Sequence, residues 1–317
     1  MLESVTRIVA VGSVDGICTA ATLLRLTGRQ DEVGLEFCQA FTVDKVDPTK
    51  WLHGRKVAFV DLAVNNRDPS MTRDFVSRLR AAGHELVAVI DEHSREDWLG
   101  VLGTFEGLEV EPQSQAQGTY GSSGAVLKAA VGAQADPRSL ELLDAADAAD
   151  RMDFTTRLGG MVNQAVKSAI QDDSRRVYLA CYLATGVTGP DVTIAGWINE
   201  YQEILANHDY ILAGMVDMGD GIVRILVTGY KVDVTTLMSR LYKGGARIVA
   251  MEGEAFVPAK KAKEVLVAFG TSDKSLDLMA IVRGAGVLPL GGFAQKVNVA
   301  LEDEIDARNA IRAALRG

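Results

Sequence analysis

The chain has 317 residues, of which 48% are hydrophobic, 24% charged and 6% aromatic. This balance is typical of soluble globular proteins and excludes the collagen-like, coiled-coil, mucin-like and disordered classes. The 33 basic and 42 acidic residues give a formal charge of −9. That charge argues against a surface built throughout to bind a nucleic-acid backbone, although it leaves room for a local basic groove.

No uninterrupted apolar run approaches the roughly 18 residues that a membrane span needs. The sequence enters a strand-like run, Thr6 to Val11, without the basic and apolar regions of a secretory signal peptide. Its cysteines, Cys18, Cys38 and Cys181, lie far apart, which favours buried thiols over disulfides or a zinc site. We therefore expect a cytoplasmic protein that does not associate with membranes.

In the first half of the chain, strand and helix patterns alternate, as expected where helices cover a largely parallel sheet. The predicted strands are 7–11, 56–61 and 85–91, and the last two end on an acid. The predicted helices are 17–25 and 68–82, each followed by a glycine, one that opens at 121–123 after a polar loop, and one that begins near Pro137.

The pattern is mostly helical from 155 to 212, with a break near 186–190, which suggests a connector rather than a domain. Alternation then resumes, with strands at 222–227, 247–251, 264–269 and 296–301 and helices at 234–242, 276–283 and 304–315. We therefore predict an α/β protein with an N-terminal parallel-sheet domain over residues 1–155, a helical connector over 156–215 and a smaller C-terminal α/β domain over 216–317.

Acids stand at three successive strand ends of the first domain: Asp15, Asp61 and the segment Asp91-Glu92-His93. One acid at a strand end is usually a turn former or a helix cap. The carboxyl ends of parallel strands meet at one edge of the sheet, however, and ligands bind there in open α/β folds. Three such acids, with those of the 144–150 segment, favour a site for a hard divalent cation.

This ordered set of motifs resembles the DHH phosphoesterases that carry a DHHA1 domain, and the resemblance covers nearly the whole chain. The superfamily includes RecJ-type exonucleases, nanoRNA and pAp phosphatases, cyclic-dinucleotide phosphodiesterases and family II pyrophosphatases. It implies a DHH domain, a smaller DHHA1 substrate-binding domain, and a metal-dependent hydrolase site in the cleft between them. The resemblance also implies Mn²⁺ or Mg²⁺ as the cofactor.

The family motifs fall on this sequence with several replacements. Asp15 matches the second acid of the first motif, whereas Ser13 stands at the first acid and Val9 or Val11 where a histidine is expected. Asp61 matches the acid that bridges two metals in active relatives.

Asp91-Glu92-His93 matches the Asp-His-His signature, with Glu92 in place of the metal-binding histidine and His93 as the phosphate-facing one. The late acid is Asp150 or Asp147, and Phe154 favours Asp150.

The resemblance thus implies catalytic roles for Asp61 and His93. It implies six metal ligands: Asp15, Asp61, Asp91, Glu92, Asp147 and Asp150. One of the two family metal sites has lost its histidine and its first acid, while the other keeps its carboxylates. We therefore expect one Mn²⁺ or Mg²⁺ ion and do not expect a second.

Candidate substrate contacts lie in both domains. Lys274 takes the place of a phosphate-binding arginine, and Gly291-Gly292-Phe293 matches a Gly-Gly-His segment. Phe293 could stack on a base, although a buried aromatic is favoured. Ser122 and Ser123 open a helix and are either an anion site or a simple cap, with neither interpretation preferred.

Two functions follow. The first is a phosphoesterase that acts on or binds a nucleotide or a short single-stranded oligonucleotide. The second is a catalytically inactive scaffold or nucleic-acid-binding relative. The retained acids support the first, and the replacements at Ser13, Glu92 and Phe293 give the second a slight advantage. The sequence leaves a homodimer open.

Overall fold

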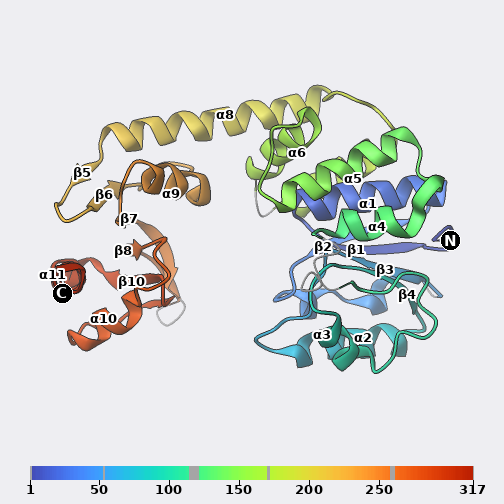
Figure 1. The fold of residues 1–317 in the computed structure, drawn as a ribbon, viewed down its shortest axis with the longest axis horizontal. Coiled ribbons are helices and arrows are strands. Elements are labelled where there is room, and N and C mark those ends of the chain that lie inside the picture. Colours follow the sequence, from blue (N-terminus) through green and yellow to red (C-terminus); the bar gives the residue numbers. More distant parts are fainter. Residues whose placement is uncertain (1, 53, 114–120, 170–171, 258–260, 317) are drawn as a thin grey trace. The chain divides into compact units, whose positions relative to one another are not determined.

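The computed structural model describes residues 2–52, 54–113, 121–169, 172–257 and 261–316 (Figure 1). The chain forms two compact units, Met1–Asn199 and Glu200–Gly317. Within the described ranges, no helix combines the length and the apolar character needed to cross a bilayer.

The first unit is built on a four-stranded parallel sheet with the order β2-β1-β3-β4. Its strands are β1 (Arg7–Val11), β2 (Gly34–Cys38), β3 (Lys56–Val60) and β4 (Glu85–Ile90). Three of them lie where the sequence predicts strands. The pattern did not reveal β2, because this edge strand contains a glycine and a glutamate and is only partly buried.

Helices cover both faces of this sheet (Figure 1). One core contains side chains of α1 (Val14–Thr27), α4 (Ser123–Val131), α5 (Pro137–Asp150), α6 (Arg157–Lys167) and α7 (Asp173–Ala184). The opposite core contains those of α2 (Pro69–Ala81) and α3 (Arg95–Leu102). Single 3-10 turns occur at η1 (Val43–Lys45), η2 (Pro48–Lys50) and η4 (Gly132–Gln134).

Two helices of the predicted connector are part of the first core. Leu158 and Val162 of α6 and Leu179 and Leu183 of α7 are buried in it. The third helix, α8 (Val192–Ala213), begins in the first unit and ends in the second. Cys18 and Cys38 are buried thiols as expected, whereas the expectation is wrong for Cys181, which is exposed.

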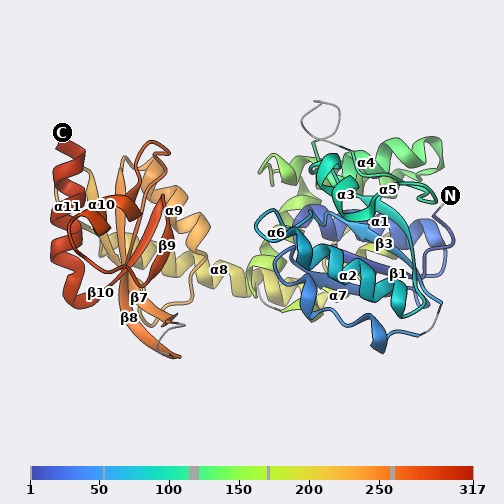
Figure 2. The same cartoon turned by 90° about the horizontal axis from the view of Figure 1, so that it is seen from below.

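The second unit has a six-stranded sheet with the order β5-β6-β7-β8-β10-β9 (Figure 2). Its strands are β5 (Val216–Asp217), β6 (Ile222–Leu226), β7 (Ile248–Val257), β8 (Ala262–Gly270), β9 (Gly291–Phe293) and β10 (Lys296–Ala300). Only β6 and β7 pair in parallel. The very short strands β5 and β9 form the two edges and were not predicted.

Helices also cover both faces of the second sheet. The helices α10 (Leu278–Gly284) and α11 (Glu304–Arg316) contribute to one core, and α9 (Val234–Lys243) contributes to the other. A 3-10 turn, η5 (Leu301–Asp303), precedes α11. All three helices overlap the segments that the sequence predicts.

Candidate metal centre

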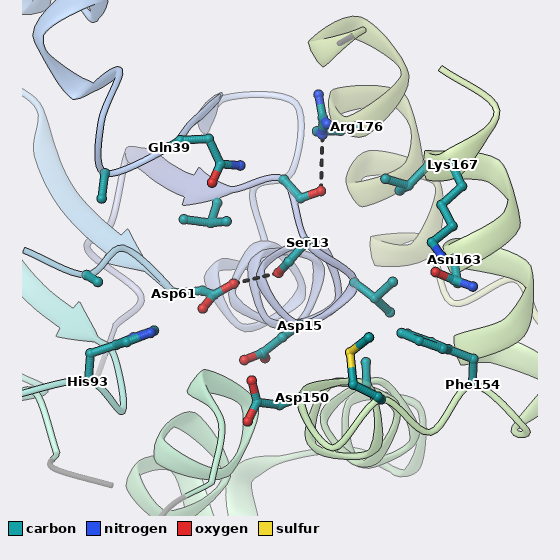
Figure 3. A pocket seen from close by; sticks show the side chains of 18 residues that line it. Ser13, Asp15, Gln39, Asp61, His93, Asp150, Phe154, Asn163, Lys167 and Arg176 are labelled. Carbon is teal, nitrogen blue, oxygen red and sulfur yellow. Dashed lines mark hydrogen bonds between the residues drawn. The ribbon is translucent and has the colours of Figure 1, made fainter. Parts of the chain in front are cut away.

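The carboxyl ends of β1, β3 and β4 bring the predicted acids together. Asp15 lies in the first turn of α1, directly after β1, while Asp61 follows β3 and Asp91 follows β4. Asp150, the last residue of α5, joins them from a helix (Figure 3). Because parallel strands end at the same edge of the sheet, acids that are distant in sequence meet in one place.

Two overlapping groups of side chains each place their potential ligand atoms within 4.8 Å of one another. One group is Asp61, Asp91, Glu92 and His93, and the other is Asp15, Glu92 and Asp150. Glu92 belongs to both groups and links them.

Asp147, the alternative to Asp150, belongs to neither group. Its Oδ1 accepts a hydrogen bond from Ser122 at 3.0 Å, and its Oδ2 pairs with Arg151. Only Asp150 therefore faces the other acids.

Asp61 is held in an unusual backbone conformation at the centre of the site. Its φ is +56°, a left-handed value that aspartate tolerates better than most residues. Ser13 Oγ donates to Asp61 Oδ2 at 2.5 Å. A Cβ on Gly16 would lie 2.1 Å from the carbonyl oxygen of Val11 and 3.1 Å from Asp61 Oδ2, so the close approach of α1 requires glycine there.

The carboxylate of Asp15 caps the N-terminus of α4. It accepts hydrogen bonds from the backbone N–H groups of Ser123 and Gly124 at 2.9 and 3.1 Å. The hydroxyls of Ser123 and Thr19 donate to it at 2.8 and 3.1 Å. Ser122, the other serine predicted to contact substrate, accepts from Ala125 N as the N-cap of α4. Neither serine lines the cavity that lies next to Asp15, Asp61 and Asp150.

Asp91 holds His93 in a fixed orientation. One of its oxygens contacts His93 Nδ1 at 2.8 Å, and Trp98 Nε1 donates to the other at 2.7 Å. The imidazole ring points toward Asp61 (Figure 3). The hydrogen bond to Asp91 is the largest cause that raises the pKa of His93 to about 9. The sequence did not predict Trp98 as a site residue, and only its position seven residues after Asp91 could have indicated it.

Burial raises the pKa values of Asp15, Asp61 and Glu92, and the charges of neighbouring acids raise those of Asp61 and Glu92 further. Desolvation is the largest cause that raises the pKa of Asp15 to about 6 and that of Glu92 to about 8. Desolvation, followed by the charges of Asp15 and Glu92, also raises the pKa of Asp61 well above its usual value. Among the residues that the structure describes, none bonds to the buried Glu92 Oε2. Such a group of buried oxygens fits a hard divalent cation, which would supply the missing positive charge.

Asp15, Asp61 and Asp150 lie on one side of a cavity of about 540 Å³, a size suited to a small organic ligand. Its other side carries Asn163 and Lys167 from α6 and Arg176 from α7, with Phe154 beside them (Figure 3). The sequence did not predict Asn163, Lys167 and Arg176 as site residues. Their only signal was the four-residue spacing of Asn163 and Lys167, which places them on one helix face.

Met152 lies at the rim of this cavity in a left-handed conformation, with φ at +59° and 68% of its surface exposed. Met152 N donates to Ala149 O and Asp153 N donates to Ala148 O, so α5 ends in a Schellman motif with methionine at the glycine position. We expect Met152→Gly to raise the free energy of unfolding by about 1 kcal/mol, because the left-handed conformation costs a residue with a Cβ about that much. Urea denaturation measures this gain.

Met152→Ala is the matched control, since it removes the same exposed side chain but keeps the Cβ. It should change stability by less than about 0.5 kcal/mol. Equal effects of the two substitutions would contradict the assignment of strain to Met152.

The remaining predicted contacts belong to the second unit. Lys274 is exposed in the turn before α10. Gly292 has φ at +131°, and a Cβ there would lie 2.1 Å from the carbonyl oxygen of Lys296, so the glycine serves the β9–β10 pairing. Gly291 opens β9 beside it. The preference for a buried Phe293 is wrong, because this side chain is 55% exposed at the sheet edge.

No family model and no curated protein matches the sequence. Solved structures do match. A pGpG-specific phosphodiesterase, PggH from Vibrio cholerae, is 14% identical and has a TM-score of 0.63, with 98% of each chain covered. An exonuclease RecJ bound to manganese is 11% identical and has a TM-score of 0.53, with 98% of this chain and 89% of that chain covered. This chain has a RecJ-like DHH fold.

The RecJ-like DHH fold confirms the predicted fold class, and it is the fold that the resemblance to DHH proteins implies. The likeness extends over nearly the whole chain, including the second unit. Within this fold, the carboxylate cluster occupies the carboxyl edge of the parallel sheet, where α/β proteins bind ligands.

Proposed function

We propose that this protein is a divalent-metal-dependent phosphoesterase that hydrolyses nucleotides or short single-stranded oligonucleotides. The observation that carries the proposal is the cluster of mostly buried carboxylates, in which the buried Glu92 Oε2 has no hydrogen-bond partner among the described residues. Without a cation, the buried charges of this cluster destabilise the fold. The cluster therefore has a functional rather than a structural explanation.

The proposed cofactor is one Mn²⁺ or Mg²⁺ ion held by Asp15, Glu92 and Asp150, with Asp61 beside them. All four side chains offer carboxylate oxygens, which these ions prefer. Such an ion supplies charge neutralisation for phosphate oxygens and an activated water. The two similar structures are those of a phosphodiesterase and a manganese-bound exonuclease, which supports the same chemistry here.

His93 is proposed to bind a phosphate oxygen of the substrate. With a pKa of about 9, the imidazole is protonated at neutral pH and donates from both nitrogens. Nδ1 is bonded to Asp91, so Nε2 is the donor that faces the cavity. Asp91 and Trp98 are positioning residues in this proposal, because both carboxylate oxygens of Asp91 are engaged within the protein.

In the second unit, Lys274 and Phe293 are proposed to bind the substrate. Both side chains are exposed. An exposed phenylalanine at a sheet edge offers a stacking surface for a nucleobase, and a lysine offers a point charge for phosphate.

Binding without hydrolysis is the second candidate function. Asp15 accepts hydrogen bonds from four donors, two of them backbone N–H groups of α4. Ser13, at the position of a family acid, donates to Asp61. These hydrogen bonds occupy carboxylate oxygens that metal ions would otherwise take, which favours a nucleotide-binding protein with weakened metal affinity.

Metal titration by calorimetry, paired with hydrolysis assays, separates the two functions. The assays use pGpG, adenosine 3′,5′-bisphosphate and a 5′-phosphorylated trinucleotide, each with Mn²⁺ or Mg²⁺. We expect one bound ion and metal-dependent cleavage of at least one substrate. Binding of a nucleotide without cleavage would establish the second function, and a protein that binds neither ion nor nucleotide would contradict both.

A further inference from the structure

Met152 is an exposed apolar residue that lines the cavity in a backbone conformation that suits glycine. Its φ is +59°, and 68% of its surface is exposed. The left-handed backbone costs stability, and among the described residues Met152 belongs to none of the hydrophobic clusters that could offset this cost. Packing within the described part of the chain therefore does not explain a methionine at this position.

The segment after α5 directs Met152 and Phe154 to the cavity and leaves its charged residues outside. Arg151 pairs with an acid of α5, and Asp153 accepts hydrogen bonds from N and Oγ1 of Thr155 at 2.9 and 2.7 Å. Neither of these two charged residues lines the cavity. Phe154 is anchored because it packs against the core of the first unit, and its ring projects into the cavity (Figure 3). Met152 and Phe154 are called the apolar shelf below.

The apolar shelf suits a flat aromatic group. A phenylalanine ring stacks on the face of a nucleobase, and a polarisable thioether makes favourable contacts with aromatic rings. Val14, Ala149 and Val166 also line the cavity, so a ligand held there meets further apolar side chains. The shelf lies close to the acids, because Met152 follows Asp150 by two residues and their Cα atoms are therefore no more than about 7 Å apart.

We propose that the apolar shelf binds the nucleobase next to the reacting phosphate, and that Met152 is a specificity-determining residue that selects ligands with a base. One sugar joins the base to the phosphate in a nucleotide, so a base can lie on the shelf while its phosphate lies at the acids. Backbone strain at Met152 is then kept because glycine would remove the thioether from the ligand. This inference rests on the proposed function, which places the phosphate at the acids.

The test compares guanosine 5′-monophosphate with ribose 5-phosphate, which lacks the base. Equilibrium dialysis with Mn²⁺ measures the affinity of the full-length protein for each, and the ratio of the two affinities measures the contribution of the base. We expect the wild type to prefer the nucleotide. Met152→Ala and Met152→Gly should each lower the ratio about fivefold, because both remove the apolar contact with the base.

The two substitutions separate the side chain from the backbone, since alanine keeps the strain and glycine relieves it. Met152→Leu should keep the wild-type ratio within about twofold, because leucine has a similar apolar volume. Met215→Ala is the matched control. It removes a methionine that is 41% exposed in the second unit and does not line the cavity, so it should leave the ratio unchanged.

A wild type without preference for the nucleotide would overturn the inference, as would a ratio that Met152→Ala leaves unchanged or that falls only with glycine. Failure to bind either ligand would overturn it as well. The proposed hydrolysis is judged separately, by cleavage of the oligonucleotides. A base preference that depends on Met152, in a protein that cleaves none of them, would support the inference and contradict the hydrolysis. Cleavage with an unchanged ratio would do the reverse.

Discussion

Asp61→Asn is expected to lower metal-dependent hydrolysis by about 10²-fold or more, while the metal-free protein becomes more stable by on the order of 1 kcal/mol. The two effects share one cause. Asp61 is a buried acid whose charge is opposed by desolvation and by the charges of Asp15 and Glu92. Asparagine removes that repulsion, and it also removes a carboxylate from the proposed cation site.

Asparagine is the appropriate replacement because it preserves the local structure. It tolerates the left-handed backbone at φ +56°, and its amide oxygen can still accept the hydrogen bond from Ser13. Activity is measured as kcat/KM on pGpG with Mn²⁺, and stability by urea denaturation in the presence of a chelator.

The control for this prediction is Asp144→Asn. Asp144 lies on α5, its side chain is 65% exposed, and it pairs with Lys128 rather than with the cluster. It should leave activity as it is and change stability by no more than about 0.5 kcal/mol. If Asp61→Asn retains full activity, the proposed cation site is wrong.

The metal-free protein should lose stability as the pH rises, with a fall in the thermal midpoint of about 5 °C or more between about pH 5 and about pH 8.5. Three groups act in the same direction. Asp15 and Glu92 have pKa values raised to about 6 and about 8, and His93 has one raised to about 9.

The direction of this change in stability depends on whether the folded or the unfolded state binds protons more tightly. Because the pKa of each group is higher in the folded state, the folded protein holds these protons over a range in which the unfolded chain has released them. The stabilisation is complete below the unfolded pKa, near 4 for the carboxyls and 6.5 for the histidine. It is lost as the pH passes through about 6 for Asp15, about 8 for Glu92 and about 9 for His93.

Mg²⁺ should restore the lost stability, and restore more of it at high pH than at low pH, because protons compete with the ion for the same oxygens. Calorimetric melting with Mg²⁺ and with a chelator measures this difference. Glu92→Gln should flatten the pH dependence, while Glu111→Gln, a control acid that pairs with Arg95 outside the cluster, should not. A midpoint that rises with pH, or an Mg²⁺ effect that is independent of pH, would contradict the assignment.

The order of elements could be read from the sequence because it depends on local patterns. Buried strands such as 56–60 are short apolar runs, and the helices of the first unit carry their own caps, such as Ser13 before α1 and Asp136 before α5. The edge strands β2, β5 and β9 lacked such patterns. They are partly buried or only a few residues long, and they form because they pair with neighbouring strands.

The acids of the candidate site could also be predicted, because Asp15, Asp61 and Asp91 each stand next to a strand end. The hydrogen-bond partners of each acid could not be predicted. The sequence does not show that α4 donates its N-terminal N–H groups to Asp15, or that Trp98 holds Asp91. Those contacts join segments that the chain brings together only after helices pack on the sheet.

The sequence by itself therefore determined the α/β class, the family resemblance and the acids at the strand ends, since each rests on residues close together in the chain. The tertiary structure decided which groups face one another across the cavity. It placed Glu92 between the two groups of acids, turned Asp147 toward Ser122 and Arg151, and set Lys167 and Arg176 on the opposite wall. The burial of side chains and the distances between them depend on how distant segments pack together, and local sequence patterns do not encode that packing.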